Sequence, residues 1–233
     1  MALLETHNLV AFYGNFQALY GIDTYVDKGE TVAIIGANGA GKSTYLHSVT
    51  GLHSDAGDTV RFDGIAIGQL PAAEVVKLGI SLVPEGRRLF SSLSVEENLL
   101  IGGYGRKGGG YWSLASIFEL FPVLKELRNL PVMSLSGGQQ QMVAFGRALI
   151  SNPRMLLCDE VSLGLAPTVI KDIYAVFPAI KESGASIVLV EQDVHRALEV
   201  ADRVYCFMEG RVTLSGRPRD LDQAMIRSAY FGT

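Results

Sequence analysis

A glycine-rich segment with one lysine and two hydroxyl residues carries the clearest chemistry in this 233-residue sequence. It fits the pattern G-x-x-x-x-G-K-[S/T], in which main-chain N–H groups, a helix N-terminus and a lysine surround the outer phosphates of a nucleoside triphosphate. The alternative is a glycine-rich turn that only joins a strand to a helix, and it leaves the lysine and the hydroxyls without a role. The residues that we expect at the nucleotide are Gly36, Asn38, Gly39, Ala40, Gly41, Lys42, Ser43 and Thr44, with the Ser43 hydroxyl on Mg²⁺.

Two adjacent carboxylates follow the apolar run 156–158. At the carboxyl end of a strand in a phosphate-binding protein, Asp159 would hold Mg²⁺ and Glu160 would polarise an attacking water. Taken alone, the segment is equally typical of an ordinary strand followed by an acidic turn. Its presence together with the glycine-rich segment favours the catalytic interpretation.

The elements needed to position these groups can be predicted from hydrophobic periodicity and turn residues. The run 31–35 is a buried strand before the glycine-rich segment, and 43–49 is a helix after it. Strands over 3–13, 19–26 and 59–62 indicate an antiparallel element. Further strands are predicted over 80–83, 155–158, 186–190, 204–208 and 211–215, and helices over 71–78, 94–101, 116–130 (broken at Pro122), 140–150, 167–181, 194–201 and 221–230. This alternation predicts a mainly parallel sheet with helices on both faces.

Composition limits the classes of function. The net charge of −4 argues against a nucleic-acid partner. Cys158 and Cys206 both lie in apolar runs without the spacing of a metal site, which favours a reducing compartment. Neither a signal peptide nor a membrane span is predicted, so we expect the chain on the cytosolic side.

The stretch Leu135-Ser136-Gly137-Gly138-Gln139 could be a serine cap and two glycines before a helix. Lying between the glycine-rich segment and the acid pair, it resembles the signature of ATP-binding cassette proteins, and the chain resembles the ATPase subunit of an ABC transporter over essentially its full length. The resemblance implies an α/β P-loop ATPase fold. A RecA-like, mainly parallel core with an antiparallel β-subdomain would occupy 1–84 and 152–233, and a helical subdomain 85–151.

The resemblance also implies a composite site. Two such subunits form a head-to-tail sandwich, and Ser136, Gly137, Gly138 and Gln139 of one meet the γ-phosphate of ATP bound by the other. Tyr13 resembles the aromatic that stacks on adenine, with a core strand aromatic as the alternative. The segment 162–167 corresponds to a loop that contacts the opposite subunit.

Three positions depart from the commoner family pattern. Glu85 replaces a glutamine in the loop that enters the helical insertion, Gln192 replaces the switch histidine, and Val161 replaces a proline after the acid pair. An ionised Glu85 can reach Mg²⁺ or accept a hydrogen bond from water but cannot donate one, and Gln192 can donate to phosphate but cannot titrate. His195 is expected on a helix surface instead.

The replacements at Glu85 and Gln192 and the run Pro84 to Arg88 resemble the ATPases of branched-chain amino acid importers, with urea and short-amide importers as close relatives. The resemblance implies a peripheral protein on the cytoplasmic face of the membrane and the shorter of two ATPases. Its partners would be a second, non-identical ATPase, two membrane permeases and, indirectly, a substrate-binding protein. Leu89, Phe90 and Leu93 are candidates for the permease contact or for local core packing.

Three rival classes remain on sequence grounds. A GTPase or small-molecule kinase would share the glycine-rich segment but does not explain 135–139. A soluble non-transport cassette usually carries two such segments in one chain, and only one is present. Lipopolysaccharide-extracting ATPases share the core motifs, but Glu85 and Gln192 favour the amino-acid group.

Overall fold

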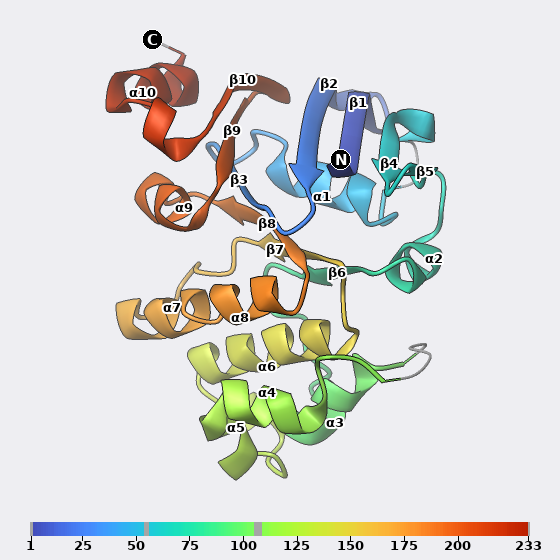
Figure 1. Cartoon of the computed structure of the whole chain (residues 1–233), viewed down its shortest axis with the longest axis vertical. Coiled ribbons are helices and arrows are strands. Elements are labelled where there is room, and N and C mark those ends of the chain that lie inside the picture. The colour runs from blue at the N-terminus through green and yellow to red at the C-terminus, as the bar shows by residue number, and fades with distance from the viewer. Residues whose placement is uncertain (1, 54–55, 105–108, 233) are drawn as a thin grey trace. The chain divides into compact units, whose positions relative to one another are not determined.

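The computed structural model describes residues 2–53, 56–104 and 109–232 and divides into two compact units (Figure 1). The first unit comprises residues 1–78 and 186–233, and the second comprises residues 79–185. The second unit therefore holds the whole range expected for the helical insertion, together with the strands and helices that flank it. The α/β class and the antiparallel β-subdomain agree with the sequence prediction.

An antiparallel sheet begins the first unit. Its strand order is β2-β1-β4-β5, and the long strands β1 and β2 alternate buried and exposed residues because one face of the sheet packs on the core. The turn between β1 and β2 falls at Gly14-Asn15. The strands are β1 (Ala2–Tyr13), β2 (Phe16–Asp27), β4 (Val60–Phe62) and β5 (Ile65–Ala66).

The parallel part of the first unit centres on β3, which pairs with β8 on one side and β9 on the other. Every residue of β3 and β8 is buried, as is typical of parallel strands covered on both faces. An antiparallel partner, β10, pairs with β9. The strands are β3 (Thr31–Ile35), β8 (Ser186–Glu191), β9 (Arg203–Met208) and β10 (Arg211–Gly216).

Two helices, α9 and α10, pack on β3 and β9. Ala197 of α9 and Ile226 of α10 form one buried cluster with alternate residues of these strands, among them Ile35 and Cys206. Cys206 and Cys158 are both buried free thiols, in keeping with the apolar runs in which they lie. The helical segments of this unit are α1 (Lys42–Val49), the 3₁₀ turn Gly57–Thr59, α2 (Ala72–Lys77), α9 (Val194–Val200), the 3₁₀ turn Pro218–Asp220 and α10 (Gln223–Phe231).

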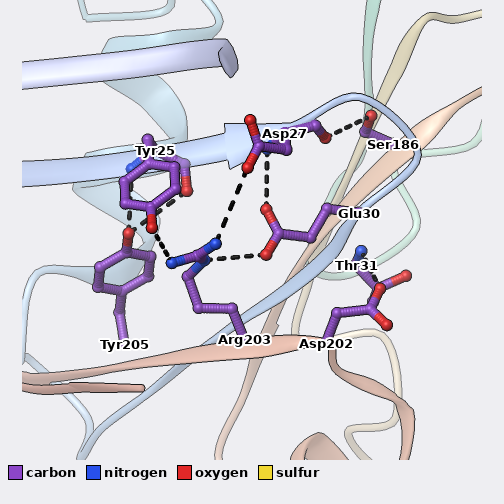
Figure 2. A network of polar contacts seen from close by, with 8 residues as sticks. All are labelled: Tyr25, Asp27, Glu30, Thr31, Ser186, Asp202, Arg203 and Tyr205. Carbon is purple, nitrogen blue, oxygen red and sulfur yellow. Dashed lines mark hydrogen bonds and ion pairs between the residues drawn. The ribbon is translucent and has the colours of Figure 1, made fainter. Parts of the chain in front are cut away.

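Arg203 lies in a polar network at the start of β3 and β9 (Figure 2). Its Nε donates to Glu30 Oε1 at 2.9 Å, and another of its nitrogens lies 3.9 Å from a carboxylate oxygen of Asp27. The same guanidinium donates to the Tyr25 hydroxyl, and the Tyr25 main-chain N–H donates to the Tyr205 hydroxyl at 3.1 Å. The network therefore ties β2 of the antiparallel sheet to β9 of the parallel one.

The second unit is built around the long helix α6, most of whose residues are buried. Its two strands, β6 and β7, pair in parallel. The bounds are β6 (Ile80–Val83), α3 (Val95–Ile101), α4 (Leu114–Leu120), α5 (Pro122–Glu126), the 3₁₀ turn Val132–Ser134, α6 (Gly137–Ile150), β7 (Met155–Asp159), α7 (Pro167–Tyr174) and α8 (Phe177–Glu182).

Three predicted helices differ from the structure. The helix predicted over 116–130 begins at Leu114 and ends at Glu126. The helix predicted over 167–181 is two helices, because Pro178 has no N–H to donate and its ring conflicts with the carbonyl four residues earlier. The helix predicted over 140–150 begins at Gly137, directly after its serine cap. The break at Pro122 is confirmed. Of the predicted glycine loop at 102–110, positions 105–108 lie outside the described residues.

No helix within the described ranges combines the length and the apolar character needed to cross a bilayer.

Candidate functional site

The glycine-rich segment joins β3 to α1 in the first unit, as the sequence predicts. Lys42 opens α1 and is 4% exposed, and its Nζ donates to the carbonyl oxygens of Gly36 at 2.8 Å and Ala37 at 3.1 Å. Asn38 and Gly39, at the tip of the loop, are exposed. The loop therefore wraps around its own lysine while its outer main chain stays open to solvent.

Main-chain contacts support the base of this loop. Gly41 caps α1 with a φ of 99°, and a methyl group on it would lie 2.7 Å from Leu19 of β2. On the turn between β9 and β10, the N–H of Gly210 donates to the Ala40 carbonyl at 3.0 Å, and its carbonyl accepts from the N–H of Tyr20 at 2.9 Å. The loop, β2 and this turn thus meet backbone to backbone, at a spacing that only residues without a Cβ allow.

Gln192 follows the strand next to the loop. Ile35, the last residue of β3, is in register with Glu191, the last residue of β8, so Gly36 and Gln192 leave the sheet at the same edge. Asp193 then caps α9 and pairs with Arg196 at 3.2 Å. The carboxyl edge of parallel strands is where α/β proteins bind ligands.

His195 and Tyr13 are both exposed. His195 is exposed on α9, as expected for a helix-surface residue. Tyr13, at the end of β1, is 50% exposed, and its ring centroid lies 4.9 Å from that of His53. The interpretation of Tyr13 as a core aromatic is therefore wrong, and its ring is available to stack on a flat ligand.

The acid pair ends β7 in the second unit. Asp159 is 3% exposed, and Glu160 has a left-handed backbone with a φ of 46°. Such a conformation in a residue other than glycine is uncommon and turns the chain sharply at the strand end. Val161 directly after it is buried.

The signature segment forms the start of α6. Ser136 is exposed and caps the helix, accepting from the Gln139 N–H at 3.3 Å, while Gln139 Oε1 accepts from the Ser136 N–H at 2.9 Å. Gly138 packs so closely that a methyl group on it would lie 2.6 Å from Val169 of α7. The serine thus stands at an open helix N-terminus, where anions bind favourably.

The loop after β6 is fastened to the second unit by residues that the sequence analysis missed. Asn98 is fully buried in α3: its Oδ1 accepts from the Phe90 N–H at 2.8 Å, and its amide donates to the Phe90 carbonyl at 3.1 Å. Arg147 of α6 donates to the carbonyl oxygens of Arg88 at 2.8 Å and Arg87 at 3.1 Å. A buried asparagine just inside a capped helix is a weak sequence signal, and nothing in the sequence marks Arg147.

Arg147 has an unusual environment for a cation. Burial holds the pKa of its guanidinium below the usual value. It lies 5.6 Å from the centroid of the Phe90 ring, and among the described residues no carboxylate pairs with it. Phe90 is itself 48% exposed, whereas Leu89 and Leu93 are partly buried. Local core packing therefore does not account for Phe90. Glu85, earlier in the same loop, is exposed.

The comparisons with known proteins agree with this architecture. The family model described as ABC transporter matches residues 19–162. A high-affinity branched-chain amino acid transport ATP-binding protein of Pseudomonas aeruginosa, BraG, is 41% identical over 99% of this chain and 100% of its own length. A probable branched-chain amino acid transport ATP-binding protein of Archaeoglobus fulgidus is 34% identical over 94% of both chains.

Solved structures extend the likeness to three dimensions. A nucleotide-free ATP-binding cassette from an ABC transporter superposes with a TM-score of 0.83 at 29% identity, covering 98% of this chain and 95% of the other. A dimeric ATP-binding cassette bound to ADP and Pi has a TM-score of 0.81 at 26% identity, covering 93% and 99%. With its glycine-rich loop, acid pair and signature segment each on the element that the fold requires, the chain belongs to the ABC transporter family of ATP-binding cassettes.

Proposed function

We propose that this cassette hydrolyses ATP to drive the import of branched-chain or related amino acids. The observation that carries the ATPase assignment is the loop that wraps Lys42 at the carboxyl edge of β3, with Gln192 leaving the sheet beside it. The substrate class follows from relatives whose names specify branched-chain amino acid transport and which align over nearly the whole chain.

In the proposed reaction, the residues of the first unit bind the nucleotide. Main-chain N–H groups of the loop and the Lys42 ammonium hold the phosphates, and Tyr13 stacks on adenine. Gln192 donates its amide to the γ-phosphate. Because an amide does not titrate, this contact is independent of pH over the physiological range.

The residues of the second unit supply the carboxylates. Glu160 polarises the attacking water, and Glu85 accepts from that water or binds Mg²⁺. Ser43 and Asp159 would supply the other oxygen ligands, a donor set that suits Mg²⁺ because this hard cation prefers hydroxyl and carboxylate oxygens. When bound, the metal neutralises charge on the β- and γ-phosphates.

The site is completed by a second subunit. Ser136, Gly137, Gly138 and Gln139 at the open end of α6 receive the γ-phosphate of ATP bound by a partner ATPase, in a head-to-tail sandwich. That partner is a non-identical cassette, and two membrane permeases hold the pair at the cytoplasmic face of the membrane. The exposed Phe90 ring is the candidate permease contact. A substrate-binding protein acts on the permeases, not on this chain.

Changing Glu160→Gln tests the assignment. The carboxamide cannot act as a base, so ATP binding is retained, turnover falls by at least about a hundredfold, and the closed dimer accumulates. The control is Lys42→Ala, which removes the phosphate contact and abolishes binding. ATP affinity of the isolated chain and turnover of the chain assembled with its co-purifying subunits are the two measurements. Undiminished turnover in Glu160→Gln contradicts the mechanism, and ATP-dependent leucine uptake by the assembly tests the substrate class.

A further inference from the structure

The backbone of the loop after β6 adopts a conformation that its sequence does not favour. Gly86, Arg87 and Arg88 are consecutive residues with left-handed φ values of 70°, 65° and 47°. For a residue with a Cβ this conformation costs about 1–2 kcal/mol. Arg147 bonds to the carbonyl oxygens of both arginines and thereby compensates for the strain. The shape of the loop is therefore imposed by α6.

That shape directs the side chain of Arg87 to the first turn of α6. A methyl group on Gly137 would lie 3.0 Å from a terminal nitrogen of the Arg87 guanidinium and 3.4 Å from its central carbon. Glycine at position 137 thus leaves the space that the guanidinium occupies. Helix α6 therefore positions both parts of Arg87. Arg147 donates to its main-chain carbonyl, and Gly137 leaves room for its side chain.

The charge of Arg87 is not balanced there. In the described part of the chain no carboxylate pairs with it. It stands at the positive end of a 14-residue helix, a position that the helix dipole makes unfavourable for a cation. The capping partner of Ser136 is the neutral Gln139, where a glutamate would have supplied negative charge. An anion arriving at this helix end would meet the guanidinium, the dipole and the open serine together.

We propose that Arg87 is a phosphate-contacting residue of the composite ATP site, donating to the terminal phosphate of the nucleotide that the partner subunit brings to α6. This inference rests on the proposed function and adds a residue to it. A guanidinium presents a planar fork of donors that matches phosphate oxygens, which a lysine at the same place would not. The neighbouring Arg88 has a similar backbone but is exposed, and nothing places its side chain at Gly137.

Arg87→Gln and Arg88→Gln form a matched pair, since each removes one positive charge from adjacent left-handed positions. Both are made in the full chain. Turnover is measured at saturating ATP in the assembly with co-purifying subunits, and ATP affinity is measured in the isolated chain. Arg87→Gln lowers turnover about a hundred- to a thousandfold, the loss typical of removing one donor to a developing anion. Arg88→Gln stays within about twofold of the unaltered chain, and both variants keep the ATP affinity of the isolated chain, because Arg87 acts on the partner's nucleotide.

Arg87→Lys separates a contact from a structural role. It keeps the charge and most of the stem, so thermal unfolding is unchanged while turnover falls to an intermediate value. Turnover of Arg87→Gln equal to that of the unaltered chain, equal losses in the Arg87 and Arg88 variants, or a weaker ATP affinity of isolated Arg87→Gln would each overturn the proposal. An unaltered chain that fails to bind ATP would instead contradict the proposed function, so the two failures are distinguishable.

Discussion

Two partly buried arginines fasten distant parts of this chain in different ways. Arg203, in the first unit, pairs with the Glu30 carboxylate and with the hydroxyl of Tyr25, joining segments more than 170 residues apart. Arg147, in the second unit, bonds only to main-chain carbonyls and faces an aromatic ring. The charge of the Arg203 guanidinium is compensated by a carboxylate, whereas the Arg147 guanidinium is held by neutral carbonyl oxygens.

The pKa values of the two guanidinium groups express this difference. Burial lowers the pKa of Arg203, but the Glu30 carboxylate together with Tyr205 and Tyr25 outweighs burial, so its pKa is raised. For Arg147 burial acts alone, and it lowers the pKa of the guanidinium. An ion pair whose charges compensate each other, as in Arg203 and Glu30, suits a contact that stays formed. Neutral carbonyls release a cation at less cost, so the contact of Arg147 with the loop after β6 is easier to open.

The largest effect on stability is expected from Arg203→Met. Methionine keeps the apolar stem but leaves Glu30, whose side chain is 11% exposed, without its cation. The free energy of unfolding falls by about 3 kcal/mol, as for other broken buried pairs, while ATP turnover per folded molecule is unchanged. Urea denaturation of the full chain measures the free energy of unfolding, and a turnover assay measures ATP hydrolysis per folded molecule. The control is Lys77→Met, which breaks an exposed pair with Glu74 and costs at most about 0.5 kcal/mol. Equal losses in both variants would contradict the contrast.

Arg147→Met is expected to be less destabilising but functionally worse. Two hydrogen bonds to main-chain carbonyls are lost, at about 1 kcal/mol each, and both acceptors can turn to water. The loop then relaxes from its left-handed conformation, so turnover falls by about tenfold or more if Arg87 and Glu85 act as proposed. The same two measurements apply. If Arg147→Met lowered stability more than Arg203→Met and left turnover intact, the roles assigned to the two arginines would be reversed.

The smallest effect is expected from alkaline pH, and it arises in the first unit. Burial is the largest cause of the raised pKa of Tyr45, Tyr205 and Cys206, all three of which lie there. The folded chain therefore holds protons that the unfolded chain releases, so stability is fully present below pH of about 8.5 and declines as pH rises. We expect a loss on the order of 1 kcal/mol by pH 10. Denaturation from pH 7.5 to 10.5 measures it, and Tyr45→Phe should flatten the decline. A stability that rises over this range would contradict the assignment of buried neutral groups.

Much of the framework could be predicted because local signals determine it. The buried strand 31–35 was predicted with its observed bounds, and the capping boxes at Ser94 and Ser136 form as their spacing requires. The split at Pro178 was also within reach, since proline inside a helical pattern is a local signal. Each of these features depends on residues within a few positions of one another.

What could not be predicted depends on contacts between distant segments. Nothing near Arg203 indicates that Glu30 and Tyr25 will face it, because the pairing exists only once the end of β2 and the start of β9 meet in the fold. The left-handed backbone at Arg87 and Arg88 is equally hidden, since arginine does not mark that conformation. Their shape comes from Arg147, which lies about 60 positions along the chain. The motifs thus predict the site chemistry, whereas the contacts between distant segments that support the loop could not be predicted from the sequence.

The meeting of the glycine-rich loop with β2 and the turn at Gly210 has a mechanical consequence. Side-chain contacts are compliant, because a rotamer can shift to absorb a displacement. Here the connections are main-chain hydrogen bonds, from the Gly210 N–H to the Ala40 carbonyl and from the Tyr20 N–H to the Gly210 carbonyl. A displacement of the glycine-rich loop would therefore be transmitted directly to the antiparallel sheet. Because Gly210 has no side chain, no flexible side-chain contact can form at this position between the glycine-rich loop and the antiparallel sheet.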